Sequence, residues 1–429
     1  MKKEYRIILY TSIFLLCVVA SIILVVKKSN SVYEEESKPK VVKHKSMLSM
    51  NLEQTAGSGD YKTVTQSSWP TEGYKFNAEL SKCENGSTLS WDDTKKAVIV
   101  SGNLSDKCYV YFDIYQPTLA EYIKSQYTGT QGENNIYYHD SDLANGAGDN
   151  SYRYAGANPN NFVCFGTTES PCPTDNLYRI IGVFGENYHG VTGKQLVKLI
   201  KYDYMTTDEL GTDGDYSQTY KEWGMDSTYK GTYGDGERIG VYYWNYKATG
   251  SATNTWSTSL LNKTNLNTNF INNIGTTWAN KIATVTWKVG GNTWANIGTK
   301  TSSVAYTNEI TNPVTTNTTD NATTYSAKIG LMYVSDYGFA ASPDAWTLTM
   351  SSYNNTTATN NNWMYMGLYE WTISRIADDS DGAFSVGSGG NVDDYYVNFY
   401  SGVRASFNLE SSVSYVSGSG SMSDPIVIN

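Results

Sequence analysis

The first strong feature of the hydrophobic pattern is Ile7–Val26, twenty residues without a charge that read IILYTSIFLLCVVASIILVV. At 1.5 Å per residue, a helix of this length matches the ~30 Å hydrocarbon core of a bilayer. Basic residues flank it on both sides. We expect a single-pass anchor in the cell membrane, with residues 1–6 cytoplasmic and the bulk of the chain extracellular. A cleaved signal peptide is the alternative, although its apolar core is usually shorter, at roughly 7–15 residues.

The pattern then changes twice before residue 117. Residues 27–67 show no sustained apolar period and are rich in Lys, Glu, Ser and Thr, which predicts a flexible stem. Residues 68–116 alternate apolar and polar positions in short runs with turn residues between them, as in Cys108–Ile114, where Val110 and Phe112 share one face. This alternation predicts a small all-β module of the immunoglobulin-like sandwich type.

Residues 117–429 have a mixed pattern. Thr118–Gln126 has the spacing of a short amphipathic helix with a threonine cap. Leu177–Phe184 and Leu196–Tyr202 are apolar runs on either side of a Gly/Asn/His turn, which predicts a β-hairpin. Long polar segments separate the remaining runs. We expect an α+β domain with short strands and long loops, and we expect the loops to carry the function.

Composition and charge narrow the classes of partner. The chain is 40% hydrophobic and 14% aromatic, with 36 tyrosines, so it can bury substantial cores. Residues 1–45 contain nine Lys or Arg and four Glu, which leaves the remainder with a net charge of −15. Because an ectodomain this acidic repels phosphate backbones, nucleic acid is not an expected partner.

The cysteines indicate an oxidising compartment. Cys17 belongs to the apolar run, and the other four are Cys83, Cys108, Cys164 and Cys172. An even number outside the membrane fits two disulfides. Pairing of neighbours along the chain is the simplest of the three possible connectivities. The three histidines are scattered and no CxxC occurs, so a structural zinc site is not expected.

The chain offers no recognisable catalytic or metal-binding motif. No GxSxG is present, which removes the usual signature of a Ser/His/Asp hydrolase. The acidic run Asp378–Gly382 lacks the regular oxygen spacing and the distal glutamate of an EF-hand. Turn formation explains it better than calcium binding. We therefore expect no cofactor, no metal and no enzymatic activity.

A patch near the C-terminus is the candidate ligand site. Aromatic residues of this patch, among them Phe399, lie beside acidic and amide residues, and tyrosine supplies large contact area at low entropy cost. The predicted ligand-binding residues are Asp393, Asp394, Tyr395, Tyr396, Asn398 and Tyr400. The alternative is that alternate residues of a strand pack their rings into the core, and the sequence favours neither explanation.

Three further residues near the C-terminus are predicted to be structural. Arg375 and Arg404 are two of only six arginines in the chain. A guanidinium in an arginine-poor domain usually joins strands through buried hydrogen bonds. We expect the same scaffold role for Trp371, close to Arg375 in sequence.

Several motifs in order resemble a known family over residues 118–429. They are Tyr178-Arg179-Ile-Ile, the Trp-led segment 256–274, Trp371-x-x-Ser374-Arg375, Gly402-Val-Arg404-Ala-Ser-Phe-Asn-Leu409 and the final Asp424-Pro-Ile-Val-Ile. This order is similar to that of surface domains from low-GC Gram-positive bacteria. Those domains resemble the C-type-lectin-like fold shared with formylglycine-generating enzymes and with the variable proteins of diversity-generating retroelements. Ala405 departs from the family pattern, which usually has Pro there.

The resemblance implies a mixed fold whose last third presents a ligand surface. Residues 377–400 use only residue types that variable positions of the diversity-generating branch reach from Asn codons. A sulfatase-modifying oxidase would need cysteines near the C-terminus, and none follows Cys172. We expect a membrane-anchored extracellular binding protein, adhesin or receptor-like, with an unknown protein or glycan ligand. The alternatives are an exported enzyme acting on cell-wall material and a structural envelope protein.

Overall fold

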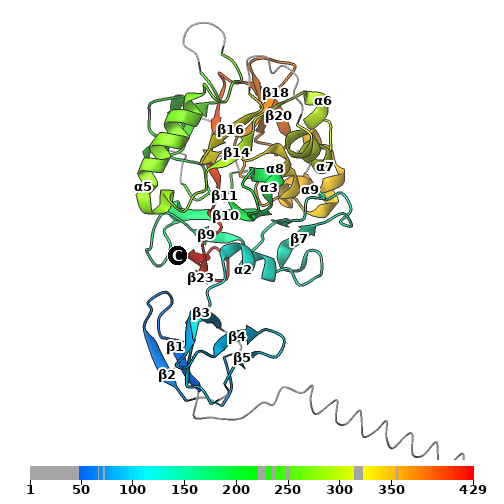
Figure 1. Ribbon diagram of the computed structural model, residues 1–429. Coiled ribbons are helices and arrows are strands. Elements are labelled where there is room, and N and C mark those ends of the chain that lie inside the picture. The colour runs from blue at the N-terminus through cyan, green and yellow to red at the C-terminus, as the bar shows by residue number, and fades with distance from the viewer. Residues whose placement is uncertain are drawn as a thin grey trace, which may run out of the picture. The chain divides into compact units, whose positions relative to one another are not determined.

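The computed structural model describes residues 48–429 except 66, 71–72, 104, 221–228, 234–237, 247–251, 314–321 and 354–355. The chain divides into two units, Met1–Tyr115 and Gln116–Asn429 (Figure 1). We consider each unit by itself.

The described part of the first unit is built from strands. Its four-stranded sheet has the order β2-β1-β6-β3, and β4 pairs with β5 in a separate hairpin. Alternating side chains of β1 and β6 form a small core of Met50, Leu52, Val110 and Phe112. The strands are β1 Leu48–Glu53, β2 Tyr61–Val64, β3 Tyr74–Cys83, β4 Thr88–Asp92, β5 Ala97–Ser101 and β6 Cys108–Ile114.

The β-module begins earlier than the sequence indicated. Strands β1 and β2 lie within residues 27–67, the range expected to be a flexible stem. The reason is that β1 pairs parallel with β6, Met50 opposite Val110 and Leu52 opposite Phe112. The alternation of apolar and polar residues over β1 is too short to predict a strand when the partner strand is not known.

One seven-stranded sheet of the second unit is built around a hairpin. Its order is β17-β22-β11-β10-β8-β7, with β9 also paired to β10. The predicted hairpin is confirmed as β10 and β11, which pair antiparallel. Every residue of both strands is buried, which explains their nearly continuous apolar runs. The strands are β7 Ile136–His139, β8 Ser151–Tyr154, β9 Phe162–Cys164, β10 Leu177–Phe184, β11 Leu196–Lys201, β17 Ile329–Gly330 and β22 Ser406–Asn408.

The other seven-stranded sheet carries the C-terminal patch. Its order is β12-β13-β21-β18-β19-β20, with β15 also paired to β18, so β20 is an edge strand. The strands are β12 Tyr216–Thr219, β13 Gly240–Tyr243, β15 Gly291–Asn292, β18 Glu370–Ile376, β19 Gly382–Val386, β20 Val392–Tyr396 and β21 Tyr400–Gly402. Two small two-stranded sheets complete the described strands: β14 Val285–Lys288 with β16 Thr324–Ala327, and β23 Tyr415–Ser417 with β24 Val427–Ile428.

The described helices are short. The predicted helix at Thr118 is confirmed as α2, and Thr118 and Glu121 cap it reciprocally. The α-helices are α2 Leu119–Ser125, α3 Glu186–His189, α4 Thr207–Leu210, α5 Ile271–Ala279, α6 Trp294–Ile297, α7 Ser302–Tyr306, α8 Val334–Phe339 and α9 Thr356–Asn360. The others are the 3-10 helices η1 Glu133–Asn135, η2 Thr174–Asn176, η5 Pro343–Thr347 and η6 Met350–Ser352, and the π-helices η3 Leu261–Phe270 and η4 Thr307–Thr311.

The predicted α+β class needs correction. Only 21% of the described residues are helical, and sheets dominate the regular structure. Many segments that the sequence left as loops form short strands, because their partners are distant in sequence. Strand β13, for example, pairs with β21. The fold is mainly β, with short helices around two large sheets (Figure 1).

The predicted membrane anchor also needs correction. The stretch 7–26 lies outside the described residues. Within the part of the chain that the structure describes, no helix has both the length and the apolar character needed to cross a bilayer. The anchor, and the single-pass membrane localisation based on it, are therefore not supported.

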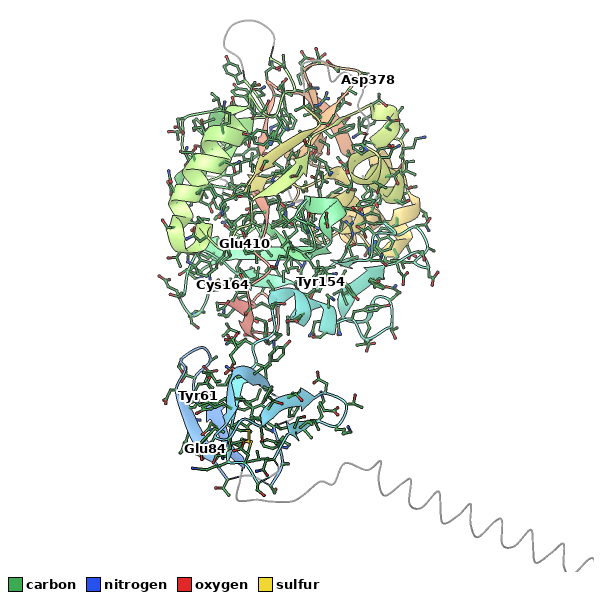
Figure 2. All side chains as sticks on the ribbon, in the orientation of Figure 1. Tyr61, Glu84, Tyr154, Cys164, Asp378 and Glu410 are labelled. Carbon is green, nitrogen blue, oxygen red and sulfur yellow. A yellow bond between two sulfur atoms is a disulfide. The ribbon has the colours of Figure 1, made fainter. Side chains whose placement is uncertain are left out.

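Both disulfides join cysteines that are neighbours along the chain. Cys83 pairs with Cys108 in the first unit, and Cys164 pairs with Cys172 in the second. These bridges are consistent with an extracellular protein. Side chains fill the space between the two sheets and the helices of the second unit (Figure 2), where most buried apolar residues form one large core and Tyr204, Ile239, Met366 and Leu368 form a smaller one.

Candidate functional site

The site is built on a pair of tyrosines that face each other across two strands. Strand β13 pairs antiparallel with β21, which places Tyr243 opposite Tyr400. Side chains of directly opposed residues lie on the same face of a sheet and interact. The two ring centroids are 6.5 Å apart and the rings meet edge to face.

Other rings extend this pair in both directions. Tyr246 stacks on Tyr243 at 4.5 Å, and Phe399 lies parallel to Tyr400 at 5.1 Å. Tyr395 stacks on Phe399 at 5.0 Å, and Tyr369 meets Tyr395 edge to face at 5.4 Å. All six rings retain some exposure to solvent. We call this row the aromatic strip: Tyr246, Tyr243, Tyr400, Phe399, Tyr395 and Tyr369.

A pocket opens beside the aromatic strip. It is small and partly open to solvent, with a volume of about 20 Å³ for the centre of a water-sized molecule, and its lining residues are Tyr220, Val241, Leu368, Tyr369, Phe399, Tyr400, Ser401 and Gly402. None of these side chains is charged. The Ser401 hydroxyl is buried and has no hydrogen-bond partner in the described structure. A side chain at Gly402 would clash, because an added Cβ would lie 2.7 Å from the Tyr204 ring.

The structure divides the predicted ligand residues between two faces of β20. Successive side chains of a strand point to opposite faces. Tyr395 belongs to the aromatic strip and shares its face with Asp393, whereas Asp394 and Tyr396 point to the other face. Tyr396 is 62% exposed. Asn398 is exposed in the turn between β20 and β21, and Tyr400 belongs to the strip.

Sequence reasoning missed half of the aromatic strip. Tyr243 and Tyr246 come from β13 and the residues after it, and Tyr369 immediately precedes β18. Their contacts with the C-terminal rings follow from the pairing of β13 and β18 with β21. No local pattern in the sequence marks these three among the 36 tyrosines.

Electrostatics differ on the two faces of β20. Burial, a hydrogen bond with Tyr369 and the nearby charges of Asp393 and Asp394 raise the pKa of Tyr395, so its hydroxyl stays protonated. Burial and the charges of Asp393, Asp379 and Asp378 raise the pKa of Asp394. Asp378 lies in the loop after β18 (Figure 2). The face of Asp394 is therefore crowded with carboxylates.

In the loop after β18, the carboxyl groups of Asp379 and Asp381 interact directly. Their side chains share a hydrogen bond, and this bond, with burial and the charge of Asp379, raises the pKa of Asp381 to about 6. Among the described residues, no group of three or more His, Cys, Asp or Glu is arranged to hold a metal ion. We therefore assign no metal to these carboxylates.

The three predicted scaffold residues are all buried. The Trp371 Nε1 donates to the Tyr242 carbonyl at 2.8 Å. The Arg404 guanidinium donates to both carboxylate oxygens of Glu370, at 2.8 and 2.9 Å. The Arg375 Nε donates to the Val289 carbonyl at 3.1 Å, while its two terminal nitrogens have no partner in the described structure.

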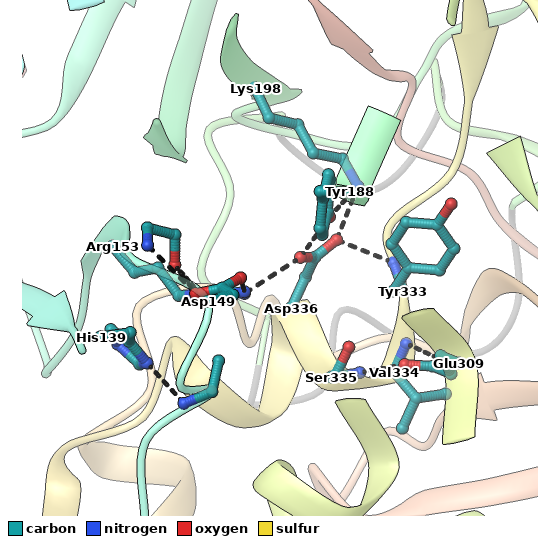
Figure 3. Close-up of polar contacts among 12 residues, drawn as sticks. His139, Asp149, Arg153, Tyr188, Lys198, Glu309, Tyr333, Val334, Ser335 and Asp336 are labelled. Atoms are coloured by element: carbon teal, nitrogen blue, oxygen red, sulfur yellow. Dashed lines mark hydrogen bonds and ion pairs between the residues drawn. The ribbon is translucent and has the colours of Figure 1, made fainter. Parts of the chain in front are cut away.

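A second group of charged residues is buried in the core of the second unit (Figure 3). The Asp336 carboxylate of α8 accepts from the Tyr188 hydroxyl at 2.6 Å and from the Lys198 Nζ at 2.7 Å. Lys198 also donates to the Tyr188 hydroxyl at 2.6 Å. Arg153 lies 3.7 Å from Asp336 and pairs with Asp149 at 2.8 Å.

These core charges are structural. Asp336, Lys198 and Arg153 are at most 1% exposed, so no ligand reaches them in this conformation. The residues come from β8, β11 and α8, and their bonds fix the helix to the sheet. Burial lowers the pKa of Lys198, while the charge of Asp336 opposes that change. A buried ion pair is retained when its hydrogen bonds are satisfied.

Comparison of the chain with family models, with curated proteins and with solved structures finds no match. The resemblance to C-type-lectin-like surface domains therefore stays a prediction. The aromatic strip and its pocket stand as the candidate site on their geometry alone.

Proposed function

We propose that the protein is an extracellular binding protein, adhesin or receptor-like, that holds a protein or glycan ligand against the aromatic strip of its second unit. The observation that carries this proposal is the row of six partly exposed rings in mutual contact beside an uncharged pocket. The two disulfides support an extracellular setting.

Aromatic rows of this kind suit binding for two physical reasons. Tyrosine buries a large area while losing few rotamers, and its hydroxyl can hydrogen-bond to a partner. Neighbouring rings that pack on one another hold each other in place, which lowers the entropy lost when a ligand binds. Tyr and Trp are accordingly frequent among the residues that dominate interface energies.

Core packing accounts for only part of the strip, since Tyr395 and Phe399 are the strip residues that pack against the buried core. Tyr242, the neighbour of Tyr243 on β13, points to the opposite face and is fully buried, with its hydroxyl bonded to the Gly211 carbonyl at 2.8 Å. The strip residues lack such burial, and Tyr246 is 44% exposed. The remaining, partly exposed area of these rings is available to a ligand.

The proposal can be tested with the purified protein and its Tyr400→Ala variant. Both would be applied to glycan arrays and to arrays of extracellular proteins. We expect a ligand that binds the wild-type protein and binds the variant at least about tenfold more weakly, a loss of about 1.4 kcal/mol. A ligand whose affinity is unchanged by Tyr400→Ala would show that the strip is not the site.

The same samples separate the two alternatives. Release of soluble fragments from purified cell-wall material would identify an exported enzyme. Concentration-dependent oligomers in the absence of any ligand would identify a structural envelope protein. Either result would replace the binding function proposed here.

A further inference from the structure

We infer that the ligand is a protein segment that inserts an apolar side chain into the pocket and places a lysine or arginine next to Asp393. This inference rests on the proposed function and narrows it from "protein or glycan" to a basic, partly apolar peptide surface. It follows from the chemistry of the pocket and from the charge beside the strip.

The pocket selects for an apolar group. Val241, Leu368 and Gly402 line it, and its polar side-chain atoms are the hydroxyls of tyrosine and Ser401. It holds no carboxylate, amide or guanidinium to pair with several ligand hydroxyls at once. Buried polar groups without hydrogen-bond partners are costly. Moving a sugar ring from water into this pocket would therefore cost more free energy than moving an aliphatic or aromatic side chain.

The surroundings of the strip select for a basic group. Residues 377–403 contain five aspartates and no lysine, arginine or histidine. Asp393 shares the face of β20 that carries Tyr395, a member of the strip. The charges of both Asp393 and Asp394 raise the pKa of the Tyr395 hydroxyl, and Asp393 has the larger effect of the two. Negative charge beside a binding surface attracts a basic partner, speeds its association and repels an acidic one.

The rings add to the same preference. The face of a tyrosine ring attracts an ammonium or guanidinium group by about 0.5–1 kcal/mol at an exposed site. A neutral glycan can stack its CH groups on the rings and hydrogen-bond to a carboxylate, but it carries no positive charge for the rings and the carboxylates to attract. Charge and ring chemistry therefore favour the same ligand.

Edge protection is the competing explanation for the acidic residues. Charged side chains on an edge strand discourage pairing with another chain, and β20 is an edge strand. This explanation applies equally to Asp393 and Asp394, which are neighbours on that strand. Ligand recognition applies mainly to Asp393, because only Asp393 faces the strip. The two residues therefore form a matched pair for a test.

The test is selection of a phage-displayed library of random linear peptides on the immobilised full-length protein, followed by affinity measurements with synthesised peptides. We expect enrichment of peptides in which Leu, Met or Phe lies close to Lys or Arg. Asp393→Asn should weaken the best peptide about tenfold, and Asp394→Asn less than about threefold. Thermal unfolding of each variant serves as the control for folding.

Salt provides a second readout. The Debye length falls from about 30 Å at 0.01 M to about 8 Å at 0.15 M ionic strength. We expect this change to weaken peptide binding to the wild-type protein more than to the Asp393→Asn variant. Equal salt dependence of the two proteins would contradict a charge contact at Asp393.

The outcomes separate this inference from the proposed function. The inference would be overturned if the enriched peptides lacked basic residues, or if their affinity were unchanged by Asp393→Asn. If Tyr400→Ala still weakened the binding of those peptides, the strip would remain the site. Failure to enrich any peptide would also overturn the inference. In that case a glycan that depends on Tyr400 would uphold the proposed function, and binding that does not depend on Tyr400 would overturn both.

Discussion

Arg404 and Glu370 form a buried, two-point ion pair. Nε of Arg404 donates to Oε1 of Glu370 at 2.8 Å, and Nη2 donates to Oε2 at 2.9 Å. Nη2 also donates to the Met364 carbonyl at 2.6 Å. The pair ties the segment after β21 to the first residue of β18. Tyr369 and the pocket residue Gly402 are close in sequence to the two partners, so the pair supports the site without touching a ligand.

Loss of Arg404 should strongly destabilise the second unit. Arg404→Met leaves a carboxylate buried without its partner, and we expect the free energy of unfolding in urea to fall by about 3–5 kcal/mol. Asp175→Asn is the control, because Asp175 pairs with Arg238 at 3.0 Å where both side chains are more than 40% exposed. That change should cost at most about 1 kcal/mol. Similar losses for both variants would contradict the role of burial.

The hydroxyl of Tyr188 should matter for stability. It accepts from Lys198 and donates to Asp336, and all three residues are buried. Tyr188→Phe should lower the free energy of unfolding by about 1–3 kcal/mol, since it leaves charged groups without a bond. Tyr138→Phe removes a hydroxyl bonded to Asn150 at an exposed position. We expect that control to change stability by about 0.5 kcal/mol or less, and an equal effect would refute the argument.

Reduction of the disulfides should destabilise the first unit more than the second. In the described part of the first unit, the core cluster has only four buried apolar residues. Its disulfide, Cys83–Cys108, closes a loop with a sequence separation of 25, against 8 for Cys164–Cys172. The longer loop implies about 3–4 kcal/mol of stabilisation. Hydrogen exchange with and without reductant should show larger loss of protection in the first unit, and the reverse order would contradict this assignment.

Asp381 should make stability depend on pH. Its pKa in the folded protein is raised to about 6, above the ordinary value of about 4. Its stabilising contribution is therefore present below about pH 4 and is lost as the pH rises through about 6. Asp381→Asn removes this dependence, so the variant should be more stable than the wild type at pH 7 and similar at pH 4. An equal difference in stability at both pH values would count against the shared hydrogen bond with Asp379.

The parts of the fold that the sequence revealed are those with strong local patterns. The runs that form β10 and β11 are apolar throughout because both strands are buried in the middle of a sheet. The α2 helix carries its own cap at Thr118. Strand β1 was missed because its stability comes from parallel pairing with β6, which no local pattern reports.

The candidate site was predictable only in part, for the same reason. Tyr395 and Tyr400 were recognisable as an aromatic group in one short segment. Tyr396 points to the opposite face of β20 from Tyr395. The sequence does not show which residues share a face of the sheet, since a shift of one residue in strand pairing exchanges the two faces. Tyr243 joins them only through the register of β13 with β21, which arises from long-range packing.

The central claim is that the aromatic strip binds the ligand, and two tyrosines of one segment test it directly. Tyr400 belongs to the strip and lines the pocket, whereas Tyr396 is 62% exposed and points away from the strip. The measurement is the affinity of Tyr400→Ala and of Tyr396→Ala for a ligand recovered from the arrays or the peptide selection. We predict a loss of about tenfold or more for Tyr400→Ala and less than about twofold for Tyr396→Ala. Equal losses, or a larger loss for Tyr396→Ala, would contradict the account.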